Sequence, residues 1–235
     1  MLSLIGIGLH DEKDITMKGL EKVRSAEYVY LEEYTSKLQC TVRDLETFYG
    51  RSVTVVGREF VEDGNVLLSQ AGYQQIALLI AGDVFAATTH IALLAEAKKK
   101  GVDVEVIHNS SVLTAVGITG LELYKFGRVT SMPFHESVTP IDVIKKNYPL
   151  HTLCLLDLDP EKNLFMDACE AIATLVKNGL DENTKVVVCA QLGSPHPTII
   201  YTEAKNVKLL EKYPQCLIIP GALHFMEEDF LKQYA

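Results

Sequence analysis

The sequence has no apolar run long enough to cross a membrane. Its longest apolar runs, Ile76 to Ala81 and Val186 to Ala190, are short, whereas a membrane-spanning helix needs about 20 such residues. The first residues, Met1 to Leu9, lack the basic start of a signal peptide and are interrupted by Gly6 and Gly8. We therefore expect a cytoplasmic protein without a membrane segment.

Positive charge and regularly spaced cysteines are also scarce. The formal net charge is −9 over 235 residues, which argues against a protein that holds nucleic acid by bulk electrostatics. No pair of cysteines and no pair of the seven histidines has metal-ligand spacing, so we expect no metal site. An odd number of distant cysteines indicates reduced thiols in a cytosolic protein. These are Cys40, Cys154, Cys169, Cys189 and Cys216.

What the sequence does contain is an alternation of apolar, strand-like runs with helical patterns along its whole length, which is typical of an α/β fold. Strands are expected at 2–9, 27–34, 51–56, 76–81, 102–107, 152–158, 185–192 and 215–219. Helices are expected after 11–16, near 41–49, and at 67–78, 87–100, 165–177, 203–212 and 223–234. A crossing at 118–128 then favours two α/β domains, residues 1–115 and 116–235.

Small and polar residues follow several of these strands. Asp83 comes just after the buried run at 76–81, and a carboxylate there either caps the next helix or binds a ligand. Gly6 and Gly8 share one face of the first strand, where either a ligand or a packed neighbour can come close. Ser110 and Ser111 either cap a helix or leave backbone N–H groups free for an acceptor.

Familiar catalytic motifs are missing. The Gly6-Ile-Gly8 pair lacks the third glycine of the dinucleotide fingerprint. Gly193-Ser194-Pro195 is not the Gly-x-Ser-x-Gly turn of a serine hydrolase. Composition and periodicity thus predict a cleft for a small molecule without specifying a reaction.

Five stretches together resemble the diphthine synthase family, and the resemblance covers Met1 to about Met226. The stretches are Gly6 to Leu20, Glu33 to Ser36, Gly82 to His90, Ala115 to Leu121 with Tyr124 to Gly127, and Gly193 to Ile199. The resemblance implies a tetrapyrrole methylase-like fold of two α/β domains with the cofactor cleft between them. It also implies a homodimer that uses S-adenosyl-L-methionine.

The resemblance further implies the substrate, which is the aminocarboxypropyl-modified histidine of translation elongation factor 2. Its amine is methylated repeatedly in diphthamide biosynthesis. The motifs identify no catalytic residue. Matched position by position, they imply cofactor contacts by Leu9, Asp83, Ala86, Ser111, Val112, Leu156, Ala190, Leu192 and His224.

The sequence departs from the family at Val84, where proline is common and would fix φ. Two alternatives remain open at this point. One is a related methylase acting on a tetrapyrrole, although Leu9-His10 replaces the Pro-Gly that is usual in the first loop of such enzymes. The other is a non-catalytic binding module on the same fold.

Overall fold

The computed structural model describes residues 1–86 and 89–235 and divides the chain into two compact units, Met1–Val112 and Leu113–Ala235. The predicted helix at 87–100 begins outside the described residues, and its described part is α5, Thr89–Lys99. None of the described helices is long and apolar enough to cross a membrane. The domain limits 1–115 and 116–235 stay a prediction.

In the described part of unit 1, the strands form one parallel sheet in the order β3-β2-β4-β1-β5. Their bounds are β1 Leu2–Gly6, β2 Tyr28–Glu32, β3 Thr54–Val56, β4 Ile76–Ile80 and β5 Val104–Ile107. Both faces are buried, which is why β4 reads as an unbroken apolar run rather than an alternating one.

The helices of unit 1 begin and end where the sequence offers caps. Their bounds are α1 Met17–Ser25, α2 Val42–Tyr49, α3 Arg58–Asp63, α4 Asn65–Ala71 and the described α5. Thr16 caps α1 by accepting from the Gly19 N–H at 3.0 Å. Thr41 caps α2 in a reciprocal pair with Asp44, and Gly50 ends that helix at φ +72°. The sequence missed α3, and the predicted helix at 67–78 is shorter and earlier in the structure.

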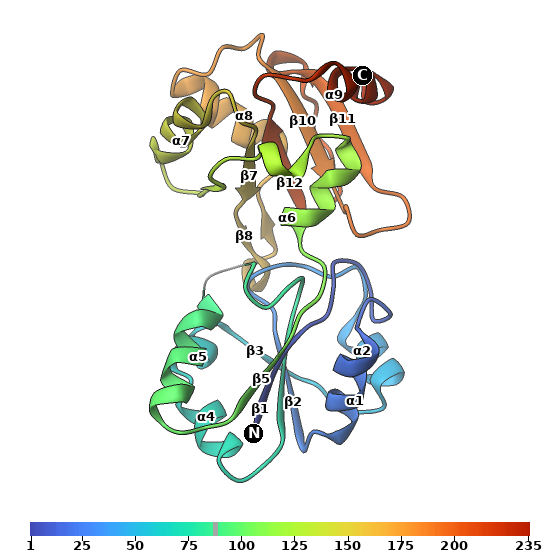
Figure 1. Cartoon of the computed structure of the whole chain (residues 1–235), viewed down its shortest axis with the longest axis vertical. Coiled ribbons are helices and arrows are strands. Elements are labelled where there is room, and N and C mark those ends of the chain that lie inside the picture. The colour runs from blue at the N-terminus through green and yellow to red at the C-terminus, as the bar shows by residue number, and fades with distance from the viewer. Residues whose placement is uncertain (87–88) are drawn as a thin grey trace. The chain divides into compact units, whose positions relative to one another are not determined.

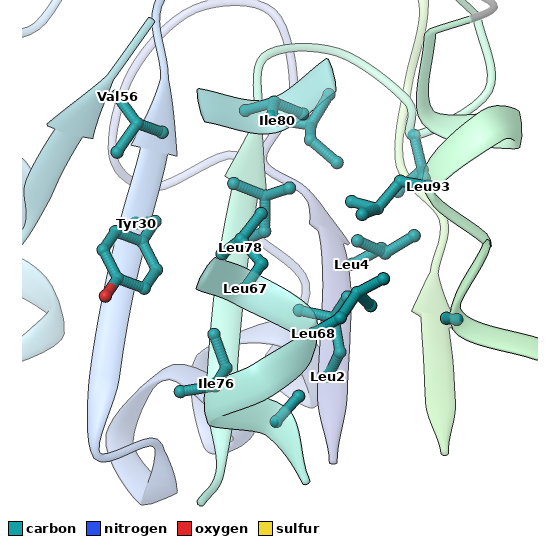
Figure 2. Packing of buried hydrophobic residues seen from close by; sticks show 14 of the residues in the cluster. Leu2, Leu4, Tyr30, Val56, Leu67, Leu68, Ile76, Leu78, Ile80 and Leu93 are labelled. Carbon is teal, nitrogen blue, oxygen red and sulfur yellow. The ribbon is translucent and has the colours of Figure 1, made fainter. Parts of the chain in front are cut away.

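Two apolar layers cover the two faces of this sheet. One contains Leu4 and Leu78 together with Leu93 and Ala97 of α5, and Figure 2 shows its side chains packed side by side. The other contains Ile5 and the α1 residues Leu20 and Val23. Figure 1 accordingly shows α4 and α5 on one side of the sheet and α1 and α2 on the other.

The helices that follow β1 and β4 therefore leave toward opposite faces, although these two strands are neighbours. Such a point, where neighbouring connections diverge, opens a crevice at the carboxyl ends of the strands. In open α/β sheets that crevice is the usual ligand site.

Unit 2 has a mixed sheet whose described strands lie in the order β11-β10-β12-β7-β6. Their bounds are β6 Thr130–Met132, β7 Thr152–Leu156, β10 Lys185–Ala190, β11 Thr198–Glu203 and β12 Gln215–Ile219. Only β6 and β7 pair in parallel; the other described pairs are antiparallel. A small hairpin, β8 Leu158–Asp159 with β9 Leu164–Phe165, follows β7.

The main helices of unit 2 are α7 Thr139–Asn147, α8 Ala168–Lys177 and α9 Phe225–Leu231, while α6 Val112–Ala115 begins on the last residue of unit 1. The apolar layer under α7 and α8 includes Ile141, Ile172, Val188 and Leu217. Short 3-10 turns occur at Val116–Thr119, Leu123–Lys125, Pro160–Lys162, Ala204–Asn206 and Lys232–Tyr234.

The predicted helix at 203–212 is wrong. Glu203 instead ends β11, which pairs with β10 over six residues, and only the 3-10 turn at 204–206 follows. Two backbone carbonyls of this segment accept hydrogen bonds from side chains instead of from helical N–H groups. The Gln215 amide donates to the Leu210 carbonyl, and the Cys169 thiol donates to the Val207 carbonyl at 3.6 Å. Ala204, Val207 and Leu210 cover the α7 and α8 layer from an irregular segment.

Candidate functional site

The loops after β1 and β4 are joined at the point where the connections diverge. Gly8 and Gly82 form a two-residue antiparallel bridge, in which the Gly82 N–H donates to the Gly8 carbonyl at 2.6 Å and the Gly8 N–H donates back at 3.3 Å. Both residues have φ near +80°, a region that favours glycine. A Cβ on Gly6 would lie 2.7 Å from the Gly82 carbonyl oxygen. The paired glycines of the first strand therefore serve close backbone approach.

Asp14 fixes the loop after β1. Its Oδ2 accepts from the backbone N–H groups of Leu9 at 3.0 Å and His10 at 2.8 Å. Thr16 caps α1, while Asp14 holds the loop that contains Leu9.

Asp83 joins the loop after β4 to the loop after β5. Its Oδ1 accepts from the Phe85 N–H at 3.1 Å, and its Oδ2 accepts from the Asn109 N–H at 3.0 Å and lies 2.9 Å from His108 Nδ1. Ala86 closes the turn by donating to the Asp83 carbonyl at 3.2 Å. These contacts do more than a helix cap would, because they tie two strand ends together.

The Asp83 carboxylate is suited to stay ionised. Burial pushes its pKa upward, but the N–H groups of Asn109 and Phe85 and the His108 ring outweigh burial and hold the pKa below its usual value. The side chain is 18% exposed. It can therefore accept a further hydrogen bond from a ligand as an anion.

Asn109 completes this edge of the sheet. Its side-chain amide donates to the carbonyls of Gly6 at 2.9 Å and Asp14 at 3.0 Å, which links the β5 loop to the β1 loop. Sequence reasoning left Asn109 and Asp14 out of the site. Asn109 lies just past β5 and Asp14 just before α1. These positions could have indicated a place in the site, since polar residues at strand ends meet at one edge of a parallel sheet.

The structure therefore brings together the loops that contain the predicted contacts of unit 1. Gly82 would place a Cβ 3.6 Å from the Leu9 side chain and 3.7 Å from the Ser110 carbonyl. Ser111 is buried next in the chain, and Val112 begins α6. Leu9, Asp83, Ala86, Ser111 and Val112 thus lie on three loops that contact one another.

The predicted contacts of unit 2 divide between two edges of its sheet. Leu156 ends β7 and Ala190 ends β10, at the edge where β12 begins, because Ala190 pairs with Gln215. Leu192 lies in the turn after β10 at that same edge. His224 follows the other end of β12, where Ile219 pairs with Thr152.

His224 also has a structural role. It caps α9 in a reciprocal pair with Glu227. The buried Glu227 carboxylate accepts from His151 Nε2 at 2.9 Å, from the Glu122 N–H at 2.9 Å and from the Lys125 ammonium. Although burial opposes it, these donors hold the pKa of Glu227 at about 2. A cofactor contact by His224 gains no support from the geometry of this unit and stays a prediction.

Comparisons with known proteins agree with one another. A family model described as "Tetrapyrrole (Corrin/Porphyrin) Methylases" matches residues 1–208. Proteins named diphthine synthase from Methanococcus maripaludis and Methanocaldococcus jannaschii are 43% identical over 249 residues and 44% identical over 251 residues, each covering 99% of this chain and 98% of the relative. A solved structure described as diphthine synthase aligns with a TM-score of 0.94 at 37% identity, covering 100% of this chain and 95% of that one.

Proposed function

The chain belongs to the tetrapyrrole methylase family and, within it, groups with the diphthine synthases, and from this we propose an S-adenosyl-L-methionine-dependent protein methyltransferase. Its substrate is the aminocarboxypropyl-modified histidine of translation elongation factor 2, in diphthamide biosynthesis. A substrate on the translation machinery would place the enzyme in the cytoplasm, and we propose a homodimer as its working form.

The observation that best supports this proposal is the joined strand ends of unit 1. Gly8, Gly82, Asp83 and Asn109 meet where neighbouring connections diverge, and their bonds leave the backbone of the three loops fixed. Because these hydrogen bonds hold the loops within the protein itself, less binding energy would be needed to order them.

These residues fit the proposed cofactor. Glycine at positions 6, 8 and 82 keeps the edge free of side chains, and Asp83 offers an anionic acceptor for a hydroxyl or an ammonium group. Leu9 and Ala86 would supply apolar contact, and Ser111 and Val112 would lie on the third loop. Leu156, Ala190, Leu192 and His224 remain predicted contacts from unit 2.

The proposed chemistry also fits the residue types. The cofactor, when bound, would supply a methyl group carried on a sulfonium. Such a transfer needs alignment and an unprotonated amine rather than a protein nucleophile, and alignment alone can supply about 7–11 kcal/mol.

Asp83→Ala tests the binding site. Millimolar S-adenosyl-L-methionine should raise the melting temperature of the wild type, since a ligand that binds only the folded state stabilises it. The Asp83→Ala variant should show no such rise. The matched control is Asp103→Ala, which removes an exposed carboxylate just before β5, at the opposite edge of the same sheet. Absence of any rise in the wild type would refute cofactor binding.

The activity itself is tested by mass spectrometry. Elongation factor 2 bearing the aminocarboxypropyl group, incubated with enzyme and labelled cofactor, should gain labelled methyl groups on that residue. Labelling of a corrin precursor instead, with none on the elongation factor, would contradict the proposal.

A further inference from the structure

One buried carboxyl group at the same edge of the unit 1 sheet has no part in the site described so far. Glu32 is the last residue of β2 and is 1% exposed. It comes just before the Glu33 to Ser36 stretch, which the cofactor site leaves unused. Burying a carboxyl group is unfavourable unless it is hydrogen-bonded or protonated, so its retention needs a reason.

Glu32 is bonded to the loop that follows it. Its Oε2 accepts from the Tyr34 N–H at 3.3 Å and the Thr35 N–H at 3.2 Å. Its Oε1 accepts from the Thr35 hydroxyl group. Thr35 itself is half-buried, so the residue that donates to the buried carboxyl group also reaches the accessible surface of the loop.

Few other charges face Glu32. The guanidinium group of Arg58, on α3, attracts the carboxylate and lies 5.1 Å from the centre of the Tyr34 ring. The Tyr34 hydroxyl group is buried with no partner in the described part of the chain, and its pKa is raised by burial and by Glu32 and Glu62. Burial raises the pKa of Glu32 to about 7, against the lowering effect of Thr35, Tyr34 and Arg58.

Glu32 is also next to the proposed cofactor loop. In the parallel ladder, Glu32 is the register partner of Ile80, two residues before Gly82. Neighbouring strands lie about 4.8 Å apart, so the β2 and β4 loops leave the sheet side by side. An acceptor held beside the Gly82 to Ala86 loop would therefore be close to Thr35.

We propose that Thr35 and Glu32 form a proton relay that removes the proton from the acceptor amine before methyl transfer. This inference rests on the proposed function, because it assigns a residue pair to the acceptor side of that reaction. Thr35 would contact the amine, and Glu32 would act through Thr35.

The relay is balanced. The ammonium group of the acceptor donates one proton to the Thr35 oxygen, while the Thr35 hydroxyl proton passes to Glu32 Oε1. The amine keeps its electron pair and Glu32 becomes a neutral carboxylic acid, which then returns its proton to solvent. A base whose pKa lies near the working pH is well matched to this role.

The relay is tested by measuring the rate of methyl transfer in a single turnover. The intact enzyme is used, with elongation factor 2 that bears the precursor group as the substrate. Glu32→Gln should lower the rate by about 10²–10⁴-fold, the usual contribution of a positioned base, with the dissociation constant of S-adenosyl-L-methionine unchanged. The wild-type pH profile should show a limb with a midpoint near pH 7 that the variant lacks. Thr35→Val should match Glu32→Gln, and Thr35→Ser should restore the rate.

The matched control is Glu33→Gln, the same substitution at the exposed neighbouring carboxylate, which should leave the rate unchanged. A readout without cofactor is ¹³C NMR of labelled glutamate carboxyl groups, in which one signal absent from Glu32→Gln should titrate near pH 7. Should Glu32→Gln fail to fold, the methyl-transfer rates of Thr35→Val and Thr35→Ser are compared instead. A low rate in Thr35→Val together with a restored rate in Thr35→Ser supports the relay, and equal rates contradict it.

Wild-type rates in Glu32→Gln or Thr35→Val, or a Glu32 signal that titrates below pH 5, would overturn the relay while leaving the proposed function intact. A wild type that neither binds the cofactor nor methylates the elongation factor would instead overturn the function, and the relay with it.

Discussion

Replacing Glu32 by glutamine should stabilise the fold at alkaline pH. The pKa of Glu32 rises from 4.5 to about 7 in the folded chain, so the folded state binds more protons than the unfolded state between these values. Stability therefore falls as pH rises from about 4.5 to 7 and stays lowered above that window. Glutamine has nearly the same shape and no charge, so it removes this dependence.

The size of the effect follows from the shift. The rise of the pKa from 4.5 to about 7 corresponds to about 3 kcal/mol above pH 7. Glutamine accepts fewer hydrogen bonds than the carboxylate bonded to Tyr34 and Thr35, which offsets the gain by about 1 kcal/mol. We expect Glu32→Gln to be about 2 kcal/mol more stable than the wild type at pH 8, and about 1 kcal/mol less stable at pH 4.5.

Urea unfolding of both proteins at several pH values between 4.5 and 8 measures this difference. Burial also lowers the pKa of His90, which makes stability rise with pH in an overlapping window. His90 is common to both proteins, so its contribution cancels in the difference between them. A difference in unfolding free energy that stays constant across this range would refute the reasoning.

Two further predictions concern the glycine bridge and the buried hub of unit 2. Gly82→Ala should destabilise the fold by about 1–2 kcal/mol, the strain of a left-handed residue, whereas Gly8→Ala should cost more because its Cβ would lie 2.3 Å from the Asp14 Cβ; equal melting temperatures would contradict this order. Glu227→Gln should cost about 3 kcal/mol at pH 7 by leaving Lys125 and His151 without their anion. Because the folded pKa of Glu227 is about 2, this stability is present above pH 4.5 and is lost as pH falls toward 2. Acid unfolding of the wild type and of Glu227→Gln, followed by circular dichroism, should therefore show a difference in stability that shrinks toward low pH. A difference that stays constant with pH would disprove this role of Glu227.

Much of unit 1 could be predicted because local patterns and tertiary packing agree there. The run from Ile76 to Ile80 is apolar throughout because both faces of a parallel strand are covered. Thr41 with Asp44 marks the start of α2 in the sequence as clearly as in the structure. The same logic pointed to Asp83, Ser110 and Ser111, since strand ends in a parallel sheet share an edge. Leu9, Ala86 and Val112 came instead from the family resemblance, and cofactor contact by all of these residues stays a prediction.

The failures have a different cause. Residues 203–212 have helical composition and spacing, but pairing of β11 with β10 and the Gln215 amide decide their conformation, and both depend on residues distant in sequence. The partners of Asp83 could not be predicted for the same reason, since Asn109 is 26 positions away along the chain. His224 caps α9 in the structure, and its contact with the cofactor stays a prediction.

The bridge between Gly8 and Gly82 is made by main-chain atoms alone. Its two hydrogen bonds therefore involve no side chain, provided that both positions stay glycine. A lineage could exchange the groups on neighbouring loops, and with them the molecules accepted there, without rebuilding this junction. Single substitutions in the neighbouring loops could therefore change ligand specificity while the bridge stays in place.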